Sequence, residues 1–274
     1  MQSELIKPTP RNNGESITPS WASMNFWFQV LIIFHISILI FQCGFDVEDP
    51  SPPLPPIWVE KSLPEEWPEW GIDAHESRGI YLAWKANTES DIIAYNIYRA
   101  SVEEYDNTTG SYLLLVHLNN KSFPEFNYVD HQVEFGRKYS YKLTAVDNGN
   151  TQSSFSDSVS YSIVHPIPFS TFSPNGLDRC LPVDRKLSWA TPNTMNVENY
   201  CVTILTSSEE FVLRTQFLPG DYNSGIESWA IPASVVLQPD MVYKWRIDTG
   251  SEYYLDRETS GSESAWASFL YLDG

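Results

Sequence analysis

The residue types that most often carry chemistry are few in this chain and are not arranged in reactive patterns. Its five histidines are scattered, and none lies in a His-Glu-x-x-His arrangement or near a cysteine at the spacing of a zinc site. No Gly-x-Ser-x-Gly nucleophile turn and no glycine-rich phosphate loop occurs. The sequence therefore predicts no metal site, no cofactor and no enzymatic activity.

Side chains with oxygen atoms that could bind a metal or act in catalysis are abundant, but their positions in the sequence indicate a solvated surface or turns. Adjacent carboxylates such as Glu103 and Glu104 are typical of a solvated face, whereas a glycosidase needs two carboxyls held roughly 5–10 Å apart in a cleft. Residues 147–150 read Asp-Asn-Gly-Asn, which offers calcium-like donors at short spacing. Because Asn-Gly supplies the positive φ that a tight hairpin needs, we predict a turn there rather than a calcium site.

Composition narrows the fold and the partners. Against 17 Lys and Arg stand 35 Asp and Glu, and the resulting charge of −18 would repel a polyphosphate, so nucleic acid is excluded as a partner. Aromatic residues make up 14% of the 274 residues and prolines number 19, which favours half-buried strands and frequent turns over helical bundles. We therefore expect an all-β protein.

The N-terminal region contains a segment unlike any other part of the chain. Residues 26–41 are apolar apart from Gln29, His35 and Ser37, a length between a signal-peptide core and the ~20 residues of a spanning helix. Cys43 follows almost directly, and this arrangement resembles the end of a bacterial lipoprotein signal peptide. The resemblance implies that residues 1–43 form the signal region and that Cys43 is the lipid attachment site.

Two other interpretations of this segment stay open. Gln42 stands where lipoprotein signals usually have Gly, Ala or Ser, and Met24 is a second candidate start. An uncleaved N-terminal helix anchor and simple secretion are the alternatives. All three carry the remainder of the chain out of the cytoplasm, so we expect a location in the cell envelope. Residues 44–65 are rich in proline and are predicted to form an extended tether.

Beyond the tether, one pattern of short alternating runs occurs twice. Large apolar residues alternate with polar or small ones, as in a strand with one buried face, and loops rich in Asn, Ser, Gly, Asp and Pro separate the runs. The first copy has runs at residues 80–84, 94–99 and 139–146, and the second at 186–189, 200–204 and 243–247. Many short strands with turns between them predict a β-sandwich in each copy.

Both copies resemble fibronectin type III domains, and the first is particularly similar to the bacterial form. In the first copy the matching positions are Trp84 at the end of strand B, residues 91–95 before strand C, 128–130 in strand E, 133–139 as the turn into F, and 153–161 in G. In the second, residues 237–243 match the E-to-F corner and 263–269 match strand G. The resemblance implies two tandem immunoglobulin-like β-sandwiches, at residues 66–164 and 165–274.

Four aromatic residues are expected to be structural. Trp84 and Trp189 should lie between the two sheets of their sandwiches. Tyr139 and Tyr243 stand where such sandwiches have a tyrosine corner, with the hydroxyl bonded to backbone upstream.

Two further pairs of residues are candidates for a site. Trp67 and Trp70 lie close together beside acidic residues, so they either cover one end of the first sandwich or form an aromatic binding surface. Cys180 and Cys201 are a candidate disulfide, although the alternation around Cys201 points its side chain away from the core.

The sequence thus predicts a non-enzymatic cell-envelope lipoprotein whose domains serve as a spacer or interaction module for an envelope protein or a glycan. One alternative is an accessory carbohydrate-binding component of a polysaccharide-processing system, which an exposed stripe of Trp67, Trp70 and Trp229 would favour. Another is a subunit of a secretion or surface-assembly complex.

Overall fold

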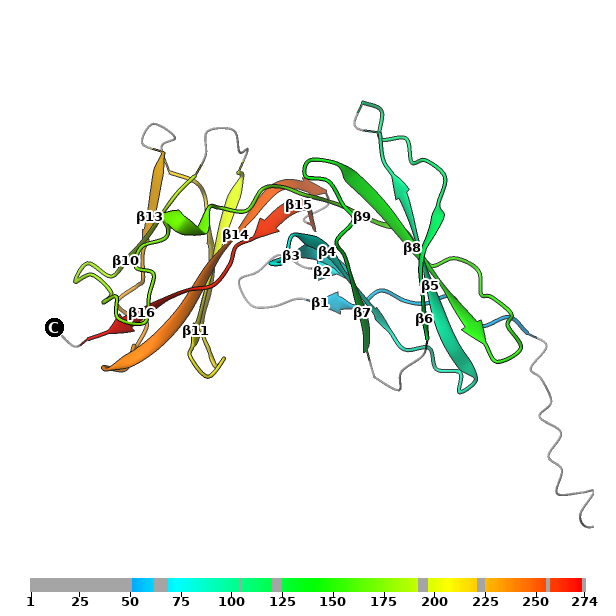
Figure 1. Ribbon diagram of the computed structural model, residues 1–274, viewed down its shortest axis with the longest axis horizontal. Coiled ribbons are helices and arrows are strands. Elements are labelled where there is room, and N and C mark those ends of the chain that lie inside the picture. Colours follow the sequence, from blue (N-terminus) through cyan, green and yellow to red (C-terminus); the bar gives the residue numbers. More distant parts are fainter. Residues whose placement is uncertain are drawn as a thin grey trace, which may run out of the picture. The chain divides into compact units, whose positions relative to one another are not determined.

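The computed structural model describes residues 51–61, 69–103, 105–119, 125–191, 197–220, 225–254 and 257–272, and within these ranges the protein is all-β, as predicted (Figure 1). Cys43, Trp67, Glu104 and the predicted signal region lie outside the described residues. The elements are β1 (Glu60–Lys61), β2 (Glu69–Trp70), β3 (Ile72–His75), β4 (Gly79–Lys85), β5 (Ile92–Ser101), β6 (Leu113–Asn119), β7 (Glu125–Asp130), β8 (Lys138–Asp147), β9 (Val159–Ile163), η1 (Phe169–Thr171), β10 (Lys186–Ala190), β11 (Asn199–Thr206), β12 (Phe211–Phe217), β13 (Ile226–Ala230), β14 (Met241–Tyr254), β15 (Arg257–Glu263) and β16 (Ala267–Tyr271).

The first sandwich packs a three-stranded sheet against a four-stranded one. The order β3-β4-β7 corresponds to strands A, B and E, and β9-β8-β5-β6 corresponds to G, F, C and C′. Alternate residues of β5 and β8 enter the space between the sheets, so that Tyr95, Ile97, Tyr141 and Leu143 are all 1% exposed or less. This is the strand order expected of a fibronectin type III-like fold.

The second sandwich repeats this arrangement with a smaller B–E sheet. β10 and β13 form this smaller sheet. In the other sheet β12, β11 and β14 follow one another in that order, and β16 pairs with the first part of β14. Ser173 adds a short strand-A contact by exchanging two backbone hydrogen bonds with Ser188, at 2.9 and 2.8 Å. The expected G strand over residues 263–269 is interrupted, because β15 ends at Glu263 and β16 begins only at Ala267.

The four predicted structural aromatic residues lie in the two cores. Trp84 is 0% exposed and Trp189 is 1% exposed, each in its own hydrophobic cluster. The Tyr139 hydroxyl accepts a hydrogen bond from Glu134 N–H at 3.2 Å, and the Tyr243 hydroxyl accepts one from Gln238 N–H at 2.7 Å. Both bonds reach five residues upstream and fix the chain where it enters strand F.

The described part of the predicted tether is docked on the first sandwich. Trp58 is 8% exposed, and its indole N–H donates to the Asp157 carbonyl at 2.8 Å. Beside it, Val59 N–H donates to the Ala83 carbonyl at 3.1 Å, which adds this segment to the edge of β4. Burying a large apolar side chain stabilises the folded state by about 1.5–3 kcal/mol. A solvated proline-rich spacer would leave these side chains in water and gain none of that free energy. Residues 53–61 are therefore part of the sandwich and not a free spacer.

The Asp-Asn-Gly-Asn segment forms a turn. Asn150 N–H donates to the Asp147 carbonyl at 3.0 Å, and the Asp147 carboxylate accepts the Thr151 N–H at 2.7 Å. The positive φ of 62° belongs to Asn150 rather than to Gly149, so the glycine is not the residue that makes the turn possible.

Candidate interaction surfaces

The outer face of the larger sheet of the first sandwich carries a cluster of aromatic side chains. It arises because Tyr98 on β5 and Lys142 on β8 alternate with the buried residues and so face away from the core. Tyr112, just before β6, and Phe155, just before β9, lie beside them. We call Tyr98, Tyr112, Lys142 and Phe155 the aromatic–lysine patch.

Contacts within this patch hold the lysine between rings. The Lys142 ammonium lies 4.7 Å from the ring centroid of Tyr112 and 5.6 Å from that of Phe155. The Tyr98 ring meets Phe155 edge-on at 5.0 Å, and the Tyr112 hydroxyl shares a 2.7 Å hydrogen bond with Ser140 Oγ. Rings ordered in this way lose little conformational entropy when a partner covers them.

The patch remains open to solvent and keeps a cation that no described carboxylate neutralises. Phe155 is 47% exposed, and the other three side chains are half-buried. In the described part of the chain, no carboxylate oxygen lies within 4 Å of the Lys142 ammonium. Aromatic rings around a positive charge can bind an apolar surface that carries an acidic group.

A second feature joins the two sandwiches into one sheet. The last part of β14 pairs with β15, and β15 pairs in parallel with β9, the G strand of the first sandwich. Here the Ser162 hydroxyl donates to Ser260 Oγ at 2.8 Å, and Val164 N–H donates to the Gly261 carbonyl at 2.9 Å. Sheet hydrogen bonds therefore cross from one sandwich to the other within the compact unit Asp49–Gly274.

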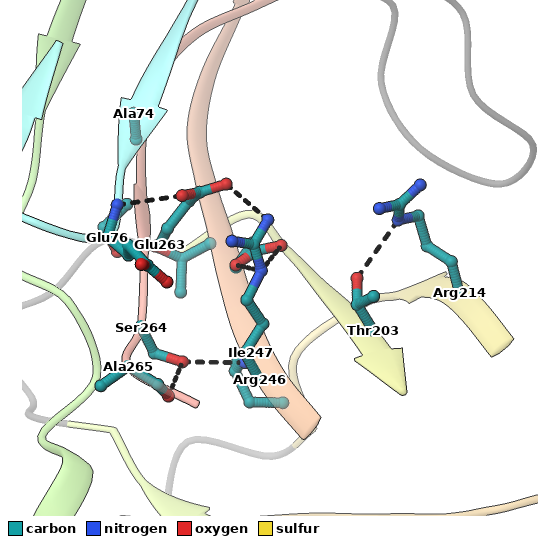
Figure 2. A network of polar contacts seen from close by, with 12 residues as sticks. Ala74, Glu76, Thr203, Arg214, Arg246, Ile247, Glu263, Ser264 and Ala265 are labelled. Atoms are coloured by element: carbon teal, nitrogen blue, oxygen red, sulfur yellow. Dashed lines mark hydrogen bonds and ion pairs between the residues drawn. The ribbon is translucent and has the colours of Figure 1, made fainter. Parts of the chain in front are cut away.

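Next to this junction lies a buried ionic network (Figure 2). Arg246 on β14 donates from Nε to Asp248 at 3.2 Å and from its terminal nitrogen to Glu263. The other Glu263 oxygen accepts the Glu76 N–H of the first sandwich at 3.0 Å. Burial alone lowers the pKa of Arg246, but the carboxylates of Asp248 and Glu263 outweigh it and raise that pKa above its usual value. Arg246 also lies 5.0 Å from the Trp266 ring centroid.

The described residues do not form the exposed tryptophan stripe that would favour the carbohydrate-binding alternative. Trp229 lies on β13 and stacks on Phe217 with 5.8 Å between ring centroids, packed against the core of the second sandwich. Trp70 is half-buried on β2, paired with Glu60 of β1. Gly71 follows it with a φ of 69°, and a side chain there would collide with the Ala83 carbonyl. Trp67 lies outside the described residues.

The candidate disulfide is absent, because the structure contains Cys180 and Cys201 as thiols. Cys180 is exposed and lies beside β16, where it faces Leu270. Cys201 is buried on β11 between Gln216 and Asp248 of the neighbouring strands, on the sheet face opposite the core residues Tyr200 and Val202. The two thiols thus belong to different parts of the second sandwich.

The described ranges contain neither a metal-binding cluster nor a membrane-spanning helix. No group of three or more His, Cys, Asp or Glu side chains there is arranged to hold a metal ion. Within the same ranges, no helix has the length and apolarity needed to cross a membrane.

Comparison with known proteins gives structural likenesses alone. No protein-family model matches, and no curated protein matches the sequence. Among solved structures, the FN1–FN3 domains of chicken CNTN1 align over 81% of this chain and 69% of theirs, with 13% identity and a TM-score of 0.34. The chicken interferon gamma receptor alpha chain aligns over 80% of this chain and 100% of its own, with 13% identity and a TM-score of 0.30.

A more partial likeness is to the pectate lyase PelI from Erwinia chrysanthemi, over 39% of this chain and 28% of that one, with 17% identity and a TM-score of 0.25. Overlap at this level assigns no function. The fold rests on the strand order of the two sandwiches.

Proposed function

We propose that the chain is a non-enzymatic interaction module of the bacterial cell envelope, and that its first sandwich binds a protein partner through the aromatic–lysine patch. The observation that carries this proposal is the solvent-accessible cluster in which Lys142 lies over Tyr112 and Phe155, and Tyr98 packs against Phe155. Aromatic side chains dominate the energetics of protein interfaces. A rigid sandwich presents them at low entropic cost.

The chemistry of the patch indicates what the partner offers. Lys142 supplies a positive charge in a chain with a net charge of −18. An acidic side chain from the partner would pair with the ammonium group, while an apolar surface next to it would cover Phe155. Such pairing contributes to specificity and to the rate of association.

This proposal predicts that the double variant Phe155→Ser, Lys142→Glu loses its partner. In a cross-linking pull-down from native membranes, we expect recovery of the cross-linked protein to fall by about tenfold or more, as for hot-spot residues. Phe169→Ser is the matched control, because Phe169 is 42% exposed on the second sandwich and lies outside the patch. Equal recovery of the same proteins by all three chains would refute the assignment.

A carbohydrate partner is the alternative from a different class. Titration of the full chain with a panel of glycans, followed by tryptophan and tyrosine fluorescence, separates the two. A glycan-induced change that disappears in the Phe155 and Lys142 variant would favour the carbohydrate-binding role over the protein-binding one. Recovery of secretion or surface-assembly proteins in the pull-down would instead indicate a subunit of such a complex.

The membrane attachment is proposed at Cys43, from the apolar segment before it and its resemblance to a lipoprotein signal. Replacement of Cys43 by serine removes the sulfur that would be acylated. We expect the precursor to remain unprocessed and radiolabelled palmitate to be absent from the protein. Cys180→Ser is the control, since Cys180 is an exposed thiol far along the chain. Unchanged processing and labelling of the Cys43 variant would show that the lipid anchor is wrong.

A further inference from the structure

Strand β6 is an edge strand without the usual protection against pairing. It ends the nine-stranded sheet, and its one partner among the described residues is β5. None of its residues is charged, and Leu113 and Leu114 are 71% and 57% exposed. An exposed, apolar edge of this kind offers a row of backbone donors and acceptors to another strand.

The other edges of the same sheet are protected. At the opposite end, β12 carries Arg214, whose guanidinium lies over the Phe211 ring at 5.9 Å. β16 is covered by the preceding chain, because Leu181 N–H donates to the Leu270 carbonyl and Leu270 N–H donates to the Arg179 carbonyl. Charge and coverage are the two usual ways in which proteins block an edge, and β6 has neither among the described residues.

The surroundings of β6 favour a second copy of this chain as its partner. Two copies with a net charge of −18 repel each other, and screening at physiological salt leaves that repulsion strong within roughly 8 Å. Residues 107–120 contain no Asp, Glu, Lys or Arg, although the whole chain contains 35 acidic and 17 basic residues. This stretch is therefore a place where two copies can approach without setting carboxylates opposite each other.

We propose that β6 pairs antiparallel with β6 of a second copy and so forms a two-fold symmetric dimer. Antiparallel pairing of identical strands is self-complementary, and it closes the free edge of both copies. The register supports the central part of the strand as the pairing segment. Val116 to Asn119 lie opposite Ile97 to Ala94 without interruption, whereas the ladder shifts at Leu115.

The test is the oligomeric state of the full chain in mild detergent, measured by analytical ultracentrifugation over a range of protein concentrations. The double variant His117→Lys, Asn119→Lys places charges on the exposed positions of the pairing segment, which an antiparallel symmetric dimer brings next to those of the second copy. Phe211→Lys is the matched control, because Phe211 is 59% exposed on the other edge strand of the sheet. We expect a dimer for the wild type and the control and a monomer for the β6 variant.

A monomeric wild type would overturn the proposal, and so would a dimer that the β6 lysines leave intact. Tryptophan fluorescence confirms that each variant is folded. Should the double variant be unfolded, Asn119→Lys alone takes its place with the same expected outcome. The patch variant Phe155→Ser, Lys142→Glu is expected to remain dimeric, so failure of the proposed partner site and failure of the dimer are separable.

Discussion

Replacement of Asp130 by alanine is expected to lower the free energy of unfolding of the first sandwich by about 3–5 kcal/mol. Asp130 is 0% exposed, and one of its carboxylate oxygens accepts from Arg99 at 2.7 Å and from the Tyr141 hydroxyl at 2.9 Å. The other oxygen accepts Gln132 N–H at 2.9 Å. Removal of the carboxylate therefore leaves a partly buried guanidinium without its anionic partner, although it still donates to the Gln132 carbonyl, and leaves a buried hydroxyl without its acceptor.

The protonation state of the network follows from its burial. Burial raises the pKa of Tyr141, and the negative charge of Asp130 raises it further. The Tyr141 hydroxyl thus stays protonated across the whole pH range in which the protein is handled, and it serves as a constant donor to Asp130. Tyr141→Phe should consequently cost less than Asp130→Ala, because it removes one hydrogen bond and leaves the ion pair with Arg99 in place.

Urea unfolding followed by tryptophan fluorescence measures this prediction. Asp157→Ala is the control, since it removes the same charge from an exposed side chain of the same sandwich, and we expect its effect to stay within about 0.5 kcal/mol. Equal unfolding midpoints for the two alanine variants would contradict a structural role for the Asp130 network.

The fold was predictable because its signal is local. Alternation with a period of two marks β4, β5, β8, β10 and β11 in the sequence, and in each of these strands the apolar set enters a core. Trp84 and Trp189 occupy equivalent strands, and the two tyrosine corners make the same bond. Each of these features depends on residues within one strand or one turn, so a single segment of sequence is enough to indicate it.

Docking of the proline-rich segment was not predictable from composition. A proline-rich segment read by itself indicates an extended chain in solvent. An extended chain, however, is also what can pair with the edge of a sheet. The deciding contact is between Trp58 and the carbonyl of Asp157, which are 99 positions apart. Trp58 and Val59, shortly after Pro55 and Pro56, were the available signal, because two large apolar residues there are unusual for a free spacer.

The aromatic–lysine patch also could not be predicted from the sequence. The four residues of the aromatic–lysine patch come from four segments, and their proximity depends on the register of β5, β8 and the chain before β9. Trp229, one of the three tryptophans whose exposed stripe would have favoured a carbohydrate-binding role, packs against the core of the second sandwich. Exposed tyrosine and phenylalanine on alternate positions of a strand are common, and nothing local separates a cluster from isolated residues.

Part of the ionic network around Arg246 could be predicted from the sequence. On β14, Trp245 and Ile247 are buried in the core, so Arg246 and Asp248 must share the opposite face. An arginine and an aspartate two residues apart on one face of a strand are in reach of each other. What the sequence could not indicate is that this face is covered, since the cover comes from β15 and from Glu76 of the other sandwich.

Replacement of Arg246 by alanine is expected to destabilise the second sandwich by about 3–5 kcal/mol. The side chains of Asp248 and Glu263 are 8% and 13% exposed, and without Arg246 both carboxylates lose their cationic partner in a site where water replaces it poorly. The cost arises from those charges and not from lost packing. The triple variant Arg246→Ala, Asp248→Asn, Glu263→Gln should therefore be more stable than Arg246→Ala alone.

Unfolding in urea gives the free energies, and hydrogen exchange of the Glu76 amide reports on the junction. This amide donates to Glu263, so its exchange should accelerate when Arg246 no longer holds that carboxylate in place. Lys186→Ala is the control for losing a positive charge, because its ion pair with Asp184 is 53% and 55% exposed and should contribute less than about 1 kcal/mol. If the neutral triple variant were no more stable than Arg246→Ala, unpaired carboxylates would not be the cause of the loss.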